Sequence, residues 1–250
     1  MKKWSLIVGL SSGLLTASVQ ADTLLGLYIG ADAWQPESTG GFAESSQSQS
    51  FEFGGKTQAT YFFSVEHPIP LVPNVRIQHN QLNVVGSTSL TRDFSFAGEE
   101  FSAGSTVYNK LDLSNTDYVL YYEILDTDVF SVDLGISAKS VKGDVEVSTS
   151  DNAPATRTLS VYIPTLYGAA KVGLPLTGLD VFGQGTYVSY DGNQLYDVQF
   201  GVGYSLVDNL ALDMRLKLGY RTVYLRLDDA EGVYTNIDFD GYFAGVELHF

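Results

Sequence analysis

Regular alternation of apolar and polar residues is the sequence feature that most constrains how this chain can fold. In the clearest segment, 212–221, every second residue is apolar: Leu212, Met214, Leu216, Leu218 and Tyr220 alternate with Asp213, Arg215, Lys217, Gly219 and Arg221. A period of two places successive side chains on opposite faces of a β-strand. This strand therefore needs an apolar environment on one side and a polar one on the other.

Segments with this alternation recur along the chain and predict about ten antiparallel strands. They lie near residues 25–34, 51–66, 75–84, 117–124, 130–139, 159–172, 181–190, 196–204, 212–221 and 241–250. Connections after odd-numbered segments are long and polar (35–50, 86–106 and 142–157), whereas those after even-numbered segments are short. Long loops at one end and tight turns at the other are typical of outer-membrane barrels. The sequence therefore predicts an all-β fold, a transmembrane antiparallel up-and-down β-barrel of about ten strands, with eight or twelve as alternatives.

Two of the segments change their apolar face part way along. In 75–84 the change comes near His79, and in 159–172 it comes at Pro164. One extra residue in a strand moves every later side chain to the other face. We therefore predict a β-bulge at each position. Within the 86–106 connection, Phe94 and Phe96 predict a further strand pair beyond the main body of the barrel.

The first 21 residues have the features of a secretory signal peptide. Lys2 and Lys3 precede a short apolar run that Gly and Ser interrupt, and small residues precede a cleavage site after Ala21. The apolar run is too short to cross a bilayer as a helix. We therefore expect residues 1–21 to be a signal peptide and 22–250 to form the barrel in the bacterial outer membrane.

Composition excludes several classes of function. The formal net charge of −15 disfavours nucleic acid as a partner, because its phosphates would be repelled. The absence of cysteine excludes disulfides and thiolate chemistry. The 16 tyrosines and 14 phenylalanines supply enough aromatic side chains for the girdles that flank the lipid-facing band of a barrel.

The end of the chain carries a more specific signal. Tyr242, Ala244, Val246, Leu248 and Phe250 form one apolar face, which resembles the terminal strand motif by which outer-membrane proteins are recognised for assembly. We assign the assembly signal to Tyr242, Val246, Leu248 and Phe250. The sequences EHPIPLVPNVR (66–76) and GYFAGVELHF (241–250) resemble those of a family of uncharacterised Gram-negative outer-membrane β-barrel proteins. The resemblance implies a monomer among outer-membrane lipids and lipopolysaccharide, inserted by the assembly machinery, but implies no activity.

Charged residues on the predicted inner faces are the candidate functional residues. They carry both signs: Arg76, Lys139, Arg215, Lys217 and Arg221, with Asp32, Glu66, Glu123, Asp133, Asp197 and Glu247. Buried charges are tolerable only when paired, so an ion-pair network is predicted inside the barrel. Ten strands enclose little more space than eight, whose interior side chains can fill. Two hypotheses follow: a plugged structural or surface-contact barrel, or a narrow solute pore whose charges select what passes.

An outer-membrane enzyme acting on lipid or peptide is the alternative. Such chemistry needs a histidine near the outer rim beside a nucleophile or carboxylate. The three histidines, His67, His79 and His249, are predicted in a periplasmic turn, in mid-strand and beside the C-terminus, and no Gly-x-Ser-x-Gly motif occurs. Acidic residues in the outer loops lack the spacing of a calcium loop. The sequence therefore predicts neither catalysis, nor a cofactor, nor a metal.

Overall fold

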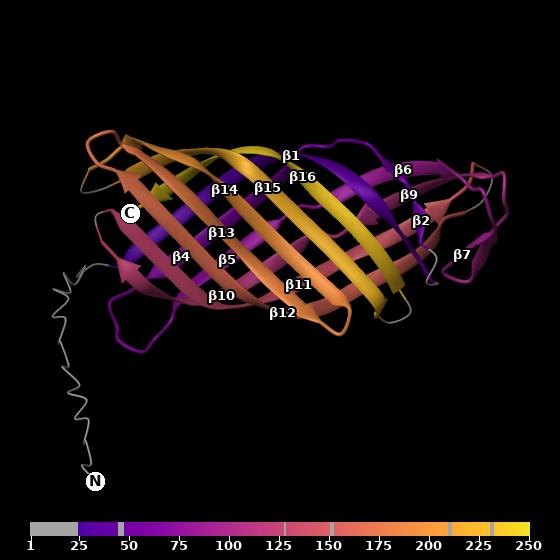
Figure 1. The fold of residues 1–250 in the computed structure, drawn as a ribbon, viewed down its shortest axis with the longest axis horizontal. Helices are drawn as coiled ribbons and strands as arrows, with labels where there is room; N and C mark the ends of the chain where they lie inside the picture. Colours follow the sequence, from indigo (N-terminus) through magenta and orange to yellow (C-terminus); the bar gives the residue numbers. More distant parts are fainter. Residues whose placement is uncertain (1–24, 45–47, 128, 151–152, 210–211, 231–232) are drawn as a thin grey trace, which may run out of the picture.

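The computed structural model is a long barrel built from β-strands, and it describes residues 25–44, 48–127, 129–150, 153–209, 212–230 and 233–250 (Figure 1). Each of ten strands pairs with its neighbours in a closed antiparallel ring: β1 (Gly26–Ala43), β4 (Gln58–Glu66), β5 (Asn74–Asn80), β10 (Asn115–Asp126), β11 (Phe130–Ser148), β12 (Ala155–Leu174), β13 (Leu179–Tyr190), β14 (Asn193–Val207), β15 (Asp213–Ala230) and β16 (Val233–His249). The predicted fold class is confirmed, with ten strands. No helix in the described part of the chain is long and apolar enough to cross a membrane. The predicted signal peptide, 1–21, lies outside the described residues.

The two ends of the barrel differ. Tight turns and the C-terminus lie at one end of the long axis, here called the turn end, and β7 (Phe94–Phe96) lies at the other, the loop end (Figure 1). The ring closes where β16 pairs with β1. At the turn end, Phe250 N donates to Leu27 O at 3.0 Å and Leu27 N donates to Phe250 O at 3.2 Å. The last residue therefore takes part in closing the barrel through its backbone.

The three segments predicted as polar loops are largely strand, so that prediction was wrong. β1 continues to residue 43 and pairs with β2 (Gln49–Ser50), while β11 and β12 continue to 148 and from 155. Between β1 and β11 the wall is completed at the loop end by β3 (Glu52–Phe53), β6 (Asn83–Ser89) and β9 (Thr106–Asp112). β7 pairs with β8 (Glu99–Phe101), which confirms the predicted strand pair. The barrel thus extends well beyond its predicted length.

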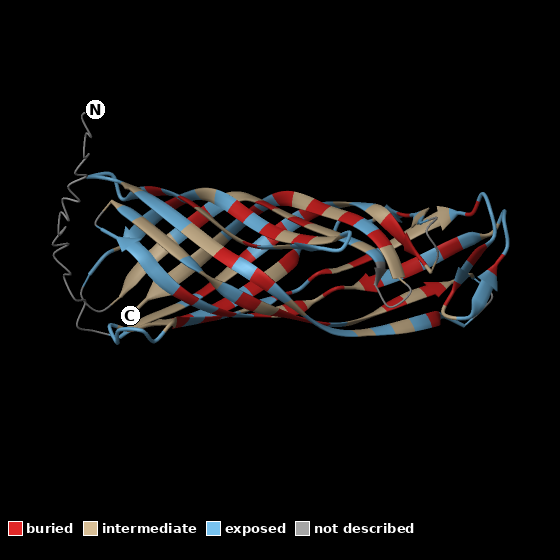
Figure 2. Ribbon diagram, turned by 60° about the horizontal axis from the view of Figure 1, so that its bottom comes forward, coloured by how far each residue is buried: buried red, intermediate tan, exposed pale blue. Residues whose placement is uncertain are grey.

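Neither predicted β-bulge occurs. β5 and β6 keep one register against β10 and β9, as the pairs Asn80 with Asn115 and Asn83 with Asp112 show. β12 runs past Pro164 opposite β11 with no register shift. Side chains therefore keep their facing along each strand, and Figure 2 shows buried and exposed residues alternating along the strands. The apolar residues move from one face of the strand to the other because the environments inside and outside the barrel change along its axis.

The outward-facing and inward-facing side chains change polarity in opposite directions along the barrel axis. On β15 the outward residues Leu216 and Leu218 are apolar and exposed, whereas the outward Arg226, nearer the loop end, is charged and exposed. The inward residues change in the opposite sense. The buried Lys217 is charged, whereas the buried Val223, nearer the loop end, is apolar. An exposed apolar band therefore surrounds the turn-end part of the barrel, with members on nearly every strand: Ile29, Phe63, Ile77, Leu120, Leu134, Ile136, Leu166, Val181, Phe200 and Val202.

Candidate functional site

A polar plug fills the interior at the level of the apolar band. Asp197 on β14 accepts two hydrogen bonds from Arg221 on β15, at 2.8 and 2.7 Å, and pairs with Lys139 Nζ on β11 at 3.4 Å. Arg221 also donates to Thr60 on β4 at 2.7 Å and to Asn80 on β5 at 2.9 Å. β14 and β15 are neighbours in the ring, but β11 is not next to β14, and neither β4 nor β5 is next to β15. The contacts of Asp197 with Lys139 and of Arg221 with Thr60 and Asn80 therefore cross the lumen.

Further ion pairs lie nearer the turn end. Lys217 Nζ is 2.8 Å from Asp32 Oδ1, and both side chains are almost fully buried. Arg215 binds Asp180 through two nitrogens and lies 3.2 Å from Glu247. Pairing with an opposite charge offsets part of the cost of removing each of these groups from water.

The predicted inward residues occupy different positions within this interior. Arg76, Lys139, Lys217, Arg221 and Asp197 are buried, and Arg215, Asp133 and Glu247 are half-buried. Glu123 is exposed at the turn end, where it accepts a hydrogen bond from Asn74 at 3.3 Å. The Arg76 guanidinium lies over the Phe62 ring, 3.7 Å from its centroid.

Sequence reasoning missed two members of the plug, Asp117 and Asp180. Asp117 binds Lys139 Nζ at 2.7 Å. It lies on the same face of β10 as Glu123, which was predicted to point inward, but the residues between them on that face, Val119 and Tyr121, are apolar and aromatic. Asp180 is the second residue of the glycine-rich β13, whose facing was ambiguous in the sequence. Knowledge of the strand register was needed to place both carboxylates beside their cations.

The plug encloses a small cavity. A cavity of about 20 Å³ lies among Arg76, Gln78, Asp117 and Gln184. One water molecule needs roughly 10–15 Å³ of such volume. The described side chains therefore leave room in this cavity for about one water.

Glycines make the cross-strand ion pairs possible. Gly245 on β16 lies directly between Asp32 on β1 and Lys217 on β15 in the strand register. A Cβ atom at Gly245 would be 1.8 Å from Asp32 Oδ1 and 2.8 Å from Ala31 O. The missing side chain is what lets the carboxylate reach across β16 to the ammonium group.

Replacing Gly245 by valine is therefore expected to lower the free energy of unfolding by about 1–3 kcal/mol, the usual cost of overpacking a filled interior. Urea titration of the refolded protein measures this. Ala244→Val is the control, because Ala244 is the next residue, faces outward and is exposed. Its effect should stay within about 0.5 kcal/mol. Equal losses in both variants would contradict the role of Gly245.

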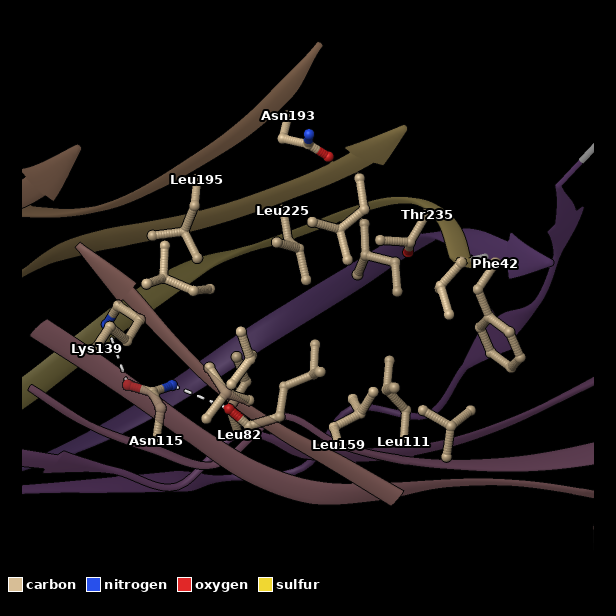
Figure 3. A pocket seen from close by; sticks show the side chains of 18 of the residues that line it. Phe42, Leu82, Leu111, Asn115, Lys139, Leu159, Asn193, Leu195, Leu225 and Thr235 are labelled. Carbon is tan, nitrogen blue, oxygen red and sulfur yellow. Dashed lines mark hydrogen bonds between the residues drawn. The ribbon is translucent and has the colours of Figure 1, made fainter. Parts of the chain in front are cut away.

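An apolar chamber lies between the plug and the loop end. It is a cavity of about 470 Å³ lined mainly by apolar side chains (Figure 3). Leu159, Leu195 and Leu225 come from three different strands, and with Leu82, which lies between β5 and β6, they surround the same space (Figure 3). Its floor is Lys139, which donates to Asn115 Oδ1 at 3.1 Å. The chamber thus ends where the plug begins.

The loop end of the chamber is capped. Phe42 and Phe96 line the chamber and pack edge to face, with ring centroids 5.4 Å apart. Arg157 on β12 pairs at 3.0 Å with Glu44, which follows β1 on another part of the wall. Glu44 also accepts a hydrogen bond from Ala97 N at 3.1 Å. This ion pair and the aromatic side chains span the mouth of the barrel.

The three histidines lie outside the chamber. His67 is in the turn after β4, with Nε2 3.2 Å from Pro73 O. His79 faces outward on β5, 3.0 Å from Thr116 Oγ1. His249 lies 3.2 Å from Asp213 Oδ2 and stacks on Tyr28, with ring centroids 4.2 Å apart. Among the described residues, no group of three or more potential ligands is arranged to hold a metal ion.

No protein family model matches the chain, and no curated protein matches it. The resemblance to an uncharacterised outer-membrane family therefore stays a prediction. Among solved structures, the chain is similar to the outer membrane protease OmpT from Escherichia coli (11% identity, 89% of this chain and 96% of that chain, TM-score 0.46). It is also similar to the transport unit of the autotransporter AIDA-I from Escherichia coli (8%, 93% and 91%, TM-score 0.39) and to a Pseudomonas aeruginosa FadL homologue (7%, 90% and 90%, TM-score 0.34). These values are too low to carry a function to this chain.

Proposed function

We propose that the chain is an outer-membrane barrel that binds an apolar small molecule in the chamber above its polar plug. The turn end would lie in the periplasm and the loop end outside the cell, as is usual for such barrels. The predicted signal peptide and assembly signal agree with export to that membrane.

The exposed apolar band supports a membrane location. Aromatic residues lie near both edges of the band: Tyr61, Tyr118, Tyr162, Tyr187 and Tyr242 toward the loop end, and Tyr122, Phe130 and Tyr204 toward the turn end. A continuous apolar surface of this kind is rare on soluble monomers, whereas lipid-facing bands between aromatic girdles are typical of transmembrane barrels. In the part of the chain that the structure describes, the closed ring also pairs each of its ten strands on both sides at the level of the band.

The observation that carries the binding function is the size and lining of the chamber. Protein interiors are close-packed, and voids larger than a water molecule are few. A volume of about 470 Å³ is therefore a feature to explain. Pockets that enclose small ligands measure roughly 300–1,000 Å³ and are mostly apolar, and a dry apolar cavity takes up apolar molecules.

The other hypotheses receive less support. A solute pore needs a continuous path, and the ion pairs across the lumen stand in that path. A purely structural or surface-contact barrel would not need the chamber. An enzyme would need reactive groups beside its substrate, and among the described residues no histidine lines the chamber. Binding is the simplest role that uses the chamber.

Quenching of Trp34 provides the test. With residues 1–21 removed, Trp34 is the single tryptophan of the chain, and it belongs to the same buried cluster as the chamber residues Phe42 and Phe239. A long-chain alcohol that carries bromine atoms quenches tryptophan only at short range. Titrating this probe into proteoliposomes is expected to give saturable quenching.

Filling the chamber should remove this signal. Leu195→Phe combined with Val223→Phe adds two rings to its wall, and saturable quenching is expected to weaken at least tenfold. The control is Val198→Phe, which changes an outward residue of the same strand β14. Quenching that does not saturate in the folded wild type, or that is equal in the filled variant, would overturn the proposal.

A further inference from the structure

The barrel wall is incomplete beside the chamber. β12 pairs with β13 only from the pair Leu166 and Tyr187 toward the turn end. On the side away from β11, no described strand pairs with β12 at residues 155–165. The β13–β14 hairpin already turns at 191–192, and pairing of β14 with β15 ends at Gln194 and Arg226. The β13–β14 hairpin therefore ends below the level that β12 and β15 reach toward the loop end. A gap remains between β12 and β15 beyond the end of this hairpin. We call this gap the wall notch.

The residues around the notch show that it opens into the chamber. Ser160 and Gln194 face outward by the alternation of their strands, yet both line the chamber. Val161 faces inward, yet 42% of its surface is exposed, and inward Tyr190 is 78% exposed. Such values are expected where the wall is open. Elsewhere along β12 the inward Ala155 and Thr165 are buried.

Pro164 gives a local reason for the notch. Proline has no backbone N–H, so within sheets it is confined to strand edges and irregular positions. Pairing of β12 with β13 stops at Leu166, two residues from Pro164. The proline therefore favours a free edge at this place rather than a continued ladder.

The notch lies at the edge of the apolar band. Leu166 and Tyr187 at its base face outward and are 65% and 47% exposed, and Tyr162 beside it is 63% exposed. Apolar and aromatic residues at this level mark the boundary between hydrocarbon and headgroups. In the proposed orientation, the notch therefore opens toward the outer leaflet.

We infer that the ligand of the chamber is a single-chain amphiphile that enters sideways from the outer leaflet through the wall notch. This inference rests on the proposed binding function. The hydrocarbon chain would occupy the chamber, where the lining is apolar. The uncharged side chains of Ser160, Asn193 and Gln194 at the opening would receive a hydrogen-bonding headgroup.

A reversible bridge across the notch tests the route. The chain has no cysteine, so Ser160→Cys with Gln194→Cys introduces a unique pair of thiols. A thiol-reactive cross-linker with an internal disulfide would close the notch, and reduction would open it again. Loading is followed by quenching of Trp34 with the brominated alcohol. The bridged variant is expected to load at least tenfold more slowly than the reduced form of the same variant.

The matched control places the same bridge on the closed side of β12. Ser140 and Tyr162 are opposite each other in the β11–β12 pairing and do not line the chamber. Bridging cysteines at these two positions should leave the loading rate unchanged. A second variant, Arg157→Ala, removes the ion pair with Glu44 at the loop end. Unchanged loading in the bridged notch variant, with faster loading in Arg157→Ala, would overturn the lateral route in favour of the loop end.

Two arms distinguish the source of the ligand. In one, bridged protein is placed in liposomes that already contain the brominated alcohol, and reduction starts the reaction. In the other, open protein receives the alcohol from cyclodextrin in the water. We expect loading from the membrane to be at least tenfold faster, and the reverse order would overturn the leaflet source. Saturable quenching is expected whichever route the ligand takes. Failure of the binding function itself would abolish saturable quenching in every variant.

Discussion

Replacing Arg221 by leucine is expected to lower the free energy of unfolding by about 3–5 kcal/mol, the usual cost of removing one partner of a buried ion pair. The guanidinium makes two hydrogen bonds to Asp197 and one each to Thr60 and Asn80. Of the Asp197 contacts described above, the ion pair with Lys139 at 3.4 Å remains when the guanidinium is removed. A partly compensated carboxylate would then remain inside the barrel. Urea titration of the protein in liposomes, followed by Trp34 fluorescence, measures the loss.

Arg226→Leu is the matched control for this variant. Arg226 is on the same strand β15, but it faces outward near the loop end and is exposed. The same chemical change should alter the free energy of unfolding by no more than about 0.5 kcal/mol. If Arg221→Leu were as stable as this control, the plug would contribute little to stability, and the filled lumen would need another explanation.

Removing residues 242–250 is expected to abolish folding into the barrel. β16 pairs with β15 on one side and with β1 on the other, and Phe250 closes the ring through two backbone hydrogen bonds with Leu27. The truncated chain would leave unpaired backbone groups of β1 and β15 at the level of the apolar band. Each such group costs several kcal/mol in hydrocarbon, so an open barrel is not stable there. Refolding into liposomes, assayed by the shift in gel mobility, should yield no folded species.

The variant Phe250→Ala separates closure from recognition. Its backbone can still bond to Leu27, so refolding into liposomes is expected to succeed. In cells, loss of the terminal ring should reduce the inserted protein several-fold if the assembly machinery reads the ending at Tyr242, Val246, Leu248 and Phe250. Equal insertion of the variant and the wild type would show that the final aromatic is not part of the assembly signal.

The parts of the fold that could be predicted are those that depend on alternation within a single strand. In 212–221 the period of two already separates Lys217 and Arg221 from Leu216 and Leu218. The predicted loops were wrong because their outward residues are polar while inward ones such as Phe42 and Val147 are buried. The predicted bulges failed for a related reason. Leu82 and Ile163 keep facing inward, but toward an apolar chamber instead of a polar plug.

What the sequence by itself determined is the strand pattern, the closing role of the C-terminal strand and the two signs of charge on the inner faces. These follow from local alternation, which assigns each side chain to a face. Only the tertiary structure decided which charges meet, where the plug ends and where the wall is open. Asp197 reaches Arg221 and Lys139 because strand register sets which inward residues share a level. Pro164 favours a free edge on β12, but the notch forms because the β13–β14 hairpin is shorter than its neighbours, and such relative heights arise only when the whole ring is assembled.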